Sequence, residues 1–362
     1  MPDRPTGPIF VVGAAGSGTT LMRLILDSHD NLAIAQETGF ARLLLANEQI
    51  PFWEFGDQWY ARIGLTADDL DRRLRDFYGG LFADWAKQRG ATRWGDKTPF
   101  HVWHLDRLAR VFPDAVFIGL VRHPGAVAHS TRRRMGHDWN RALWFWLRDH
   151  VELLTRAAAL GDRMALVRYE DLVADPEPVL RELFDWLGEP WSQQVLDFHQ
   201  VHRGRGTAAE VEGATRSDKP IDPARVGAWV ETMDEQRWAR LRRVRVDRLT
   251  RALGYRADRP LPVRAWGPSG RTGLLRGSAV PALISAWPRV RWEQRPGPSF
   301  ANRALTPQEL AGLRRRTAAG PRPPRLERLL DGPVGDAGRR LLHALPPDAR
   351  RPVRALLALT RR

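Results

Sequence analysis

The stretch Pro8-Ile9-Phe10-Val11-Val12-Gly13-Ala14-Ala15-Gly16-Ser17-Gly18-Thr19-Thr20-Leu21-Met22-Arg23 decides the fold of this chain. Its first part is aromatic and β-branched, which is typical of a buried strand. Gly13, Gly16 and Gly18 follow, where the backbone can turn sharply and approach a ligand. A helix is then predicted from Leu21 to Ser28. Because a strand, a glycine loop and a helix N-terminus aim several backbone N–H groups at one point, this geometry suits a phosphate.

The spacing of this loop is close to the nucleotide-binding pattern G-x-x-x-x-G-K-[ST]. Gly13 and Gly18 fit that pattern, but Thr19 stands at the lysine position and is followed by Thr20. The lysine of the pattern reaches the β- and γ-phosphates, and the loop has no substitute for it. Ser17 and the two threonines add three hydroxyls. We therefore predict a phosphate-binding loop that is poorly equipped to polarise a γ-phosphoryl group; a βα turn without a ligand is the alternative.

Gly13 through Arg23, with the following Leu24 to His29, resembles the 5′-phosphosulfate-binding loop of sulfotransferases. More narrowly, it is similar to bacterial sulfotransferases related to tyrosylprotein sulfotransferases. The resemblance covers residues 7 to 256. It implies a P-loop-like α/β fold, 3′-phosphoadenosine 5′-phosphosulfate (PAPS) as the sulfonate donor and 3′,5′-ADP as the product.

Strand and helix patterns alternate along the rest of the chain. Further strands are predicted over residues 31–35, 115–121 and 165–168, and helices over 40–47, 66–88, 99–110, 124–134, 139–159, 176–187, 222–229 and 234–253. This alternation favours a parallel sheet with helices on both faces. We therefore expect an α/β, P-loop-like three-layer sandwich with a central parallel sheet.

The charge of the chain changes near residue 258. Residues 259–362 hold 21 arginines and six acidic residues, whereas residues 1–258 hold 36 basic and 36 acidic residues. We predict a sulfotransferase-like domain over 1–258 and an Arg/Pro-rich C-terminal extension over 259–362. The extension could dock on the domain, contact an acidic partner or an anionic surface, or be mostly disordered.

The chain has no cysteine, which excludes disulfides and thiolate chemistry. Residues 1–8 lack the apolar region of a signal peptide, and no run of eighteen apolar residues occurs. We expect a soluble, cytoplasmic protein with no nucleic-acid partner.

The segment Val121 to Ser130 matches a second motif of the family. There, an arginine at a strand end and a serine eight residues later hold the 3′-phosphate, and Arg122 and Ser130 have this form. The preceding strand puts Arg122 at the carboxyl edge of the sheet, where open α/β folds bind ligands. A guanidinium binds phosphate through parallel hydrogen bonds. Arg134 could add charge. The alternative is an arginine that caps carbonyls and an ordinary helix serine.

Glu37 and Lys97 are the candidate catalytic residues. Glu37 follows the second strand, so it should open towards the same cleft as the loop, and the resemblance implies that it is the general base. Lys97, in Asp96-Lys97-Thr98-Pro99, matches a family turn whose lysine contacts the bridging oxygen or the sulfonate. The alternatives are a carboxylate that favours a helix dipole and a surface lysine. Only three of the 57 basic residues are lysine, which supports the match.

Other residues are weaker candidates. The resemblance implies nucleotide contacts by Tyr169, after the fourth strand, and by Lys219, in a late loop. The alternative for Tyr169 is an aromatic ring at the edge of the core. The histidines show no metal spacing with carboxylates, and His101 is a remote alternative base.

Two glycines depart from the family pattern. Gly39 stands where tyrosylprotein sulfotransferases have arginine, which weakens the case for a tyrosine acceptor. Gly16 stands where relatives commonly have arginine or lysine beside the leaving phosphate. Without a basic residue at this position, either Lys97 carries more of the charge stabilisation or the reaction is slower.

These observations together predict a PAPS-dependent sulfotransferase that uses in-line transfer to a hydroxyl or amine. Glu37 and Lys97 are predicted to be catalytic, and the predicted donor-binding residues are Gly13, Gly16, Ser17, Gly18, Thr19, Thr20, Arg122, Ser130, Tyr169 and Lys219. No metal is expected. A catalytically weak nucleotide-binding P-loop protein and a kinase-like phosphotransferase are the alternatives. Small-molecule, glycan and peptide acceptors all stay open, and the aromatic segment Pro51–Gly64 could line an acceptor cleft or form a surface flap.

Overall fold

The computed structural model describes residues 6–41, 44, 62–205, 218–263, 266 and 274–284. All of these residues lie in one compact unit. Most of the aromatic segment from Pro51 to Gly64, the end of the helix predicted over 40–47 and most of the C-terminal extension lie outside the described residues.

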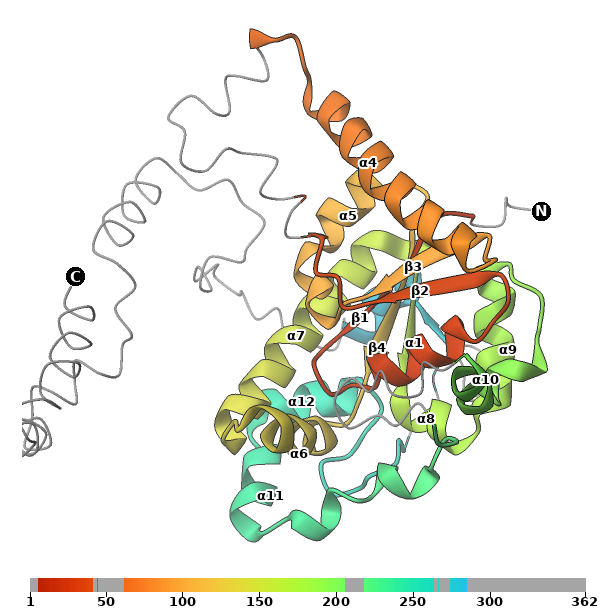
Figure 1. Cartoon of the computed structure of the whole chain (residues 1–362). Helices are drawn as coiled ribbons and strands as arrows, with labels where there is room; N and C mark the ends of the chain where they lie inside the picture. The colour runs from red at the N-terminus through yellow and green to blue at the C-terminus, as the bar shows by residue number, and fades with distance from the viewer. Residues whose placement is uncertain are drawn as a thin grey trace, which may run out of the picture. The chain divides into compact units, whose positions relative to one another are not determined.

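A six-stranded sheet runs through the middle of the described residues (Figure 1). The strand order is β2-β3-β1-β4-β5-β6. Its strands are β1 (Ile9–Gly13), β2 (Leu32–Gln36), β3 (Arg93–Lys97), β4 (Val116–Val121), β5 (Met164–Arg168) and β6 (Leu275–Arg276). The pairs among β1 to β5 are parallel, and β6 pairs antiparallel with β5. The parallel strands end at one edge of the sheet. The glycine loop follows β1 there, Glu37 follows β2, Lys97 ends β3 and Arg122 follows β4.

Helices cover both faces of the sheet, because alternate residues of each central strand point to opposite sides. In β1, Phe10 and Val12 belong to one buried cluster and Ile9 and Val11 to the other. The first cluster includes residues of α4 (Ala67–Gln88), α5 (Leu105–Val111), α6 (Pro124–Met135), α7 (Trp139–Leu160), α11 (Glu235–Leu241) and α12 (Val244–Ala252). The second includes residues of α1 (Thr19–Asp27), α8 (Tyr169–Ala174), α9 (Pro176–Leu187) and α10 (Phe198–Gly204). The predicted three-layer α/β sandwich is confirmed.

The strand β3 was not predicted, because its sequence Arg-Trp-Gly-Asp-Lys is largely polar. All five residues are nevertheless buried. Arg93 donates to the carbonyl oxygens of Gly7 at 2.6 Å and Leu187 at 2.8 Å. Because distant parts of the chain accept hydrogen bonds from the Arg93 Nε and Nη1, β3 can occupy the interior of the sheet.

Three predicted helices differ in detail. The helix over 99–110 starts as the 3₁₀ segment η1 (Pro99–His104) before α5, and the helix over 222–229 is the 3₁₀ segment η5 (Pro223–Val226). The helix over 234–253 is broken into α11 and α12. In α12, the N-cap residue Arg243 is non-helical, with ψ 135°.

The sheet takes its edge strand from the predicted extension. Leu275 and Arg276 of β6 pair with Leu166 and Ala165. The division at residue 258 stays a prediction. Within the described part of the chain, we find no helix that is both long and apolar enough to cross a membrane, and the cytoplasmic location also stays a prediction.

Candidate functional site

The loop between β1 and α1 has the conformation that its glycines predict. Gly16 and Gly18 have φ angles of 90° and 99°, which side-chain-bearing residues rarely adopt. A Cβ at Gly18 would also lie 2.3 Å from the Tyr169 ring. The N–H of Ser17 donates to the carbonyl oxygen of Ala14 at 3.0 Å. The first N–H groups of α1 have no acceptor within the helix, so they are available to an anion.

Arg122, Ser130 and Tyr169 meet at this loop. The Nη1 of Arg122 donates to the carbonyl oxygen of Gly16 at 2.9 Å, and its Cζ lies 3.8 Å from the centre of the Tyr169 ring. A Cβ at Gly16 would lie 3.1 Å from the Ser130 Oγ. The predicted convergence of Arg122 and Ser130 on the glycine loop is therefore present.

The backbone of Arg122 is fixed from several sides. Its carbonyl oxygen accepts from the Trp146 indole at 2.9 Å. The next N–H, of His123, donates to buried Glu170 at 3.0 Å. The His123 ring accepts from the N–H of Gly125 at 3.0 Å and so caps α6. Burial lowers the pKa of His123 to about 4, so the neutral ring can accept this bond. These contacts set both Arg122 and the start of the helix that carries Ser130.

Lys97 joins the loop to Glu37. Its buried Nζ donates to Glu37 Oε1 at 2.6 Å and to Thr20 Oγ1 at 3.4 Å. The Glu37 side chain is 46% exposed, so its carboxylate can meet a molecule from solvent. An exposed base, a buried cation and the phosphate loop are thus contiguous.

Asp96 supports this arrangement, although no role was predicted for it from the sequence. Its Oδ2 accepts from the N–H and the hydroxyl of Thr38, at 3.3 and 2.7 Å, and its Oδ1 accepts from the Thr98 hydroxyl at 2.7 Å. Glu37, with φ 43°, is the only described residue other than glycine with positive φ. Its N–H donates to the Lys97 carbonyl oxygen at 2.8 Å. Contacts on both sides therefore hold Glu37 in an uncommon conformation.

Arg134 lies beside Gly16 of the loop. A Cβ at Gly16 would be 3.1 Å from its Nη2. Desolvation of the guanidinium, and then the charge of Arg122, lowers the pKa of Arg134, while the carboxylate of Glu37 acts in the opposite direction. Arg134 thus lies within electrostatic reach of both residues.

Two candidates do not join this site. Lys219 is exposed, and no contact among the described residues brings it to the loop. His101 is buried 3.3 Å from an Asp96 oxygen without a hydrogen bond between them. Burial lowers the pKa of His101 to about 3, which makes its ring a weak proton acceptor and disfavours it as the base.

The site suits an anionic ligand. The Ser17 Oγ and the Arg122 Nε are buried and have no hydrogen-bond partner within the described residues. Such atoms are costly unless a ligand or water satisfies them. Lys97, Arg122 and Arg134 bring three positive charges to the site, and Glu37 is its exposed carboxylate. The clustered cations favour a ligand that carries phosphate charges.

The family model, the relatives and a solved structure that this chain matches are all sulfotransferases. The model of the family described as the sulfotransferase family matches residues 8–193. Protein-tyrosine sulfotransferase 1 of Danio rerio is 30% identical over 236 residues, which are 61% of this chain and 65% of that protein. The human protein-tyrosine sulfotransferase 1 is 32% identical over 243 residues, 61% of this chain and 63% of that protein. The chain thus spans slightly less than two thirds of each relative.

The fold is shared with solved structures, among them the sulfotransferase domain from the curacin biosynthetic pathway, with a TM-score of 0.51 and 22% identity. The match covers 72% of this chain and 100% of that domain.

Proposed function

This chain belongs to the sulfotransferase family, and on that premise we propose that it transfers a sulfonate group from PAPS to a hydroxyl or amine acceptor. The observation that carries the proposal is the position of Lys97, whose Nζ contacts both Glu37 and Thr20 of the loop. The kinase-like alternative is not favoured, because Thr19 replaces the loop lysine and the matching family is that of sulfotransferases.

The donor would bind across the loop and α6. The backbone N–H groups of the loop and the Ser17 hydroxyl would hold the 5′-phosphosulfate. The 3′-phosphate would lie at Arg122 and Ser130, where the unpartnered Arg122 Nε offers a charge-assisted hydrogen bond. Tyr169 would contact the nucleotide beside Arg122. Lys219 stays a predicted donor contact from the late loop.

The chemistry then needs one proton acceptor and one cation. The acceptor oxygen attacks the sulfur as the bond from sulfur to the 5′-phosphate oxygen breaks. The hydroxyl proton passes to Glu37, and 3′,5′-ADP leaves. Lys97, beside both the base and the loop, stabilises the negative charge that develops on the leaving phosphate. Because Gly16 brings no charge, Arg134 and Lys97 supply the cations on this side of the loop.

Donor binding is tested by calorimetry with 3′,5′-ADP. Arg122→Ala should weaken binding at least tenfold, because a hydrogen bond to a charged group contributes about 1.5–3 kcal/mol. Arg133→Ala removes an exposed arginine of α6; it is the matched control and should bind like the wild type. Tighter binding of ATP with Mg²⁺ than of 3′,5′-ADP would favour a kinase instead.

Transfer is tested with ³⁵S-labelled PAPS and a panel of phenols, alcohols and a tyrosine-containing peptide. Glu37→Gln should lower turnover by about 10²–10⁴-fold, because the proton acceptor is lost. Binding of 3′,5′-ADP should persist, because Glu37 is not among the proposed donor contacts. Lys97→Met should also lose turnover, whereas the exposed Lys87→Met should not. Full activity of Glu37→Gln would show that another group is the base.

A further inference from the structure

A small cavity lies directly beside the proposed reaction site. It has a volume of about 220 Å³. Its lining includes Ala14 and Ala15, the two residues that precede Gly16 in the loop, and Phe100, three residues after Lys97. The cavity therefore begins at the two turns that carry the proposed donor loop and the proposed catalytic lysine.

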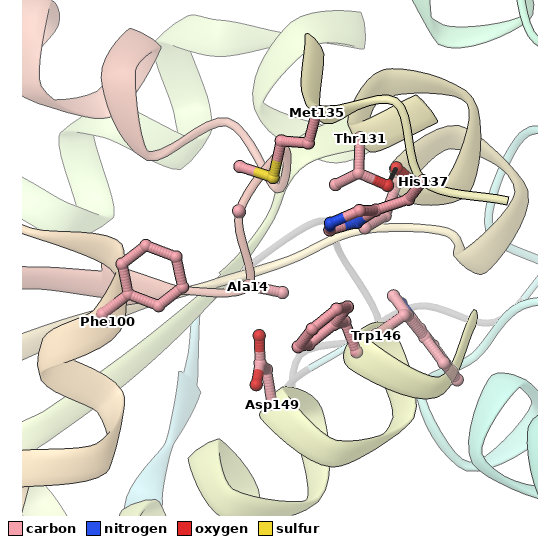
Figure 2. Close-up of a pocket in the computed structure, with 10 residues that line it drawn as sticks. Ala14, Phe100, Thr131, Met135, His137, Trp146 and Asp149 are labelled. Atoms are coloured by element: carbon pink, nitrogen blue, oxygen red, sulfur yellow. Dashed lines mark hydrogen bonds between the residues drawn. The ribbon is translucent and has the colours of Figure 1, made fainter. Parts of the chain in front are cut away.

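The cavity has an exposed rim and a buried floor. Phe100 and Met135 are 51% and 44% exposed, and apolar side chains of this size at a rim are typical of binding sites. At the other end, Trp146 and Asp149 of α7 are buried. Figure 2 shows these four side chains around the cavity, with Asp149 directed into the space between Phe100 and Trp146. A ligand that enters past Phe100 would extend towards Trp146.

The floor carries no unpaired charge. The Asp149 Oδ1 accepts from the Nε and Nη2 of Arg148, at 2.8 and 2.6 Å. The Arg148 guanidinium lies 4.5 Å from the centre of the Trp103 ring. Because Arg148 already pairs with this carboxylate, a charged ligand of either sign would gain little from it and would lose its own hydration. The floor favours an uncharged group.

The volume limits the size of this group. An apolar cavity of about 150 Å³ holds benzene, so this cavity holds about one substituted ring or an aliphatic group of equal size. A whole sterol or a glycan does not fit. A tyrosine in a peptide carries its hydroxyl at the tip of the side chain. When that tip is at Glu37, the peptide lies outwards and leaves the cavity empty.

We propose that this cavity holds the uncharged, apolar body of a small acceptor, whose hydroxyl stays on the Phe100 side near Glu37 and Lys97. This inference rests on the proposed sulfonate transfer. It assigns a small hydroxyl compound as the acceptor class, and not a peptide tyrosine. Transfer follows the step described above, so the hydroxyl proton goes to Glu37 and the sulfonate to the acceptor oxygen.

Filling the cavity tests the proposal. Thr131 lines it from α6, and its hydroxyl donates to the Val127 carbonyl oxygen of its own helix at 2.9 Å. Thr131→Phe should occupy the space and lower kcat/KM for 4-nitrophenol and benzyl alcohol at least tenfold. Thr155 of α7 is exposed and makes the same kind of bond, to the Val151 carbonyl oxygen at 2.9 Å. Thr155→Phe is thus the matched control and should keep the wild-type kcat/KM.

Binding measurements separate this proposal from the proposed function. Both variants should bind 3′,5′-ADP within twofold of the wild type, which shows that the fold and donor site are intact. With 3′,5′-ADP saturating, 4-nitrophenol should bind to wild type and Thr155→Phe but at least tenfold more weakly to Thr131→Phe. If the two variants bound 4-nitrophenol equally and had equal kcat/KM for it, the cavity assignment would be overturned. It would also be overturned if both variants used a tyrosine-containing peptide equally well and more efficiently than 4-nitrophenol. If the wild type bound 4-nitrophenol as described but transferred sulfonate to no acceptor, the proposed function alone would be overturned.

Discussion

Glu37 and Asp96 show how a single buried residue can position an exposed one. Asp96 bonds to Thr38, the residue next to Glu37, and to Thr98, the residue next to Lys97. Both proposed catalytic side chains are therefore adjacent to one carboxylate. The strained φ of Glu37 persists because these contacts hold its backbone. We infer that Asp96 is a positioning residue.

The Asp96 carboxylate also has a pH signature. Burial, opposed by the Thr38 and Thr98 hydrogen bonds, raises the pKa of Asp96 from 3.8 to about 6. A raised pKa means that the folded protein binds the proton more tightly than the unfolded chain. The free energy of unfolding should therefore fall as pH rises from about 4 to about 6, by up to about 3 kcal/mol from this group.

Asp96→Asn should remove this part of the pH dependence, because the amide does not titrate. Urea unfolding at pH 4, 5 and 6 measures it, and the exposed Asp84→Asn is the control. The same variant should lower kcat more than 3′,5′-ADP affinity, since it disturbs Glu37 and not the donor loop. A pH slope and kcat like those of the wild type would contradict both roles of Asp96.

At the scale of elements, β3 is the strand that assembles the site. It lies between β1 and β2, so Lys97 at its end lies between the glycine loop and Glu37. The register pairs Val11 and Gln36 with Lys97. The close approach of β1 requires glycine at position 95, because a Cβ there would lie 2.5 Å from the Ile9 carbonyl oxygen and 2.7 Å from the Ile34 Cδ1.

Gly95→Ala should therefore destabilise the protein by about 1–3 kcal/mol, since backbone atoms of β1 cannot move aside cheaply. Gly80→Ala, inside α4 with nothing within 4 Å of the added Cβ, is the matched control. It should stabilise the protein by about 0.5–1 kcal/mol, because alanine favours a helix over glycine. Urea midpoints measure both changes. Equal shifts of the same sign would show that β3 is not tightly packed.

At the scale of the molecule, the described residues of the predicted extension contribute to the core. Trp266, Leu274, Leu275 and Val280 are buried, and the Arg168 guanidinium lies 4.7 Å from the centre of the Trp266 ring. Full burial of one such side chain stabilises a protein by about 1.5–3 kcal/mol. Their sum is comparable to the total stability of a typical domain.

A chain that ends at residue 258 should therefore unfold at a lower urea concentration than one that ends at residue 284, or should fail to fold. The longer chain keeps β6 and the four buried side chains. Both are compared with the full chain by urea unfolding and 3′,5′-ADP binding. Equal urea midpoints for the two shortened chains would favour the boundary at residue 258.

Much of the fold could be predicted because its signals are local. A few consecutive residues are enough to predict the apolar strands β1 and β4, the glycine loop and the start of α6 at its proline. The motif at Arg122 and Ser130 is similarly local, because Ser130 lies in the helix that begins two residues after Arg122. The strand β3 could not be predicted, because its polar residues become acceptable in a sheet only through partners elsewhere in the chain.

The sequence by itself determined the α/β class, and it singled out the glycine loop, Glu37, Lys97, Arg122 and Ser130 as candidates, because they lie in short local motifs that resemble those of sulfotransferases. Only the tertiary structure decided that Lys97 bridges Glu37 and Thr20, that Asp96 supports both, that Arg134 lies against Gly16 and that a cavity opens beside them. The physical reason is that these contacts join residues far apart in the chain, and their distances are set by the register of parallel strands and the packing of α6 and α7.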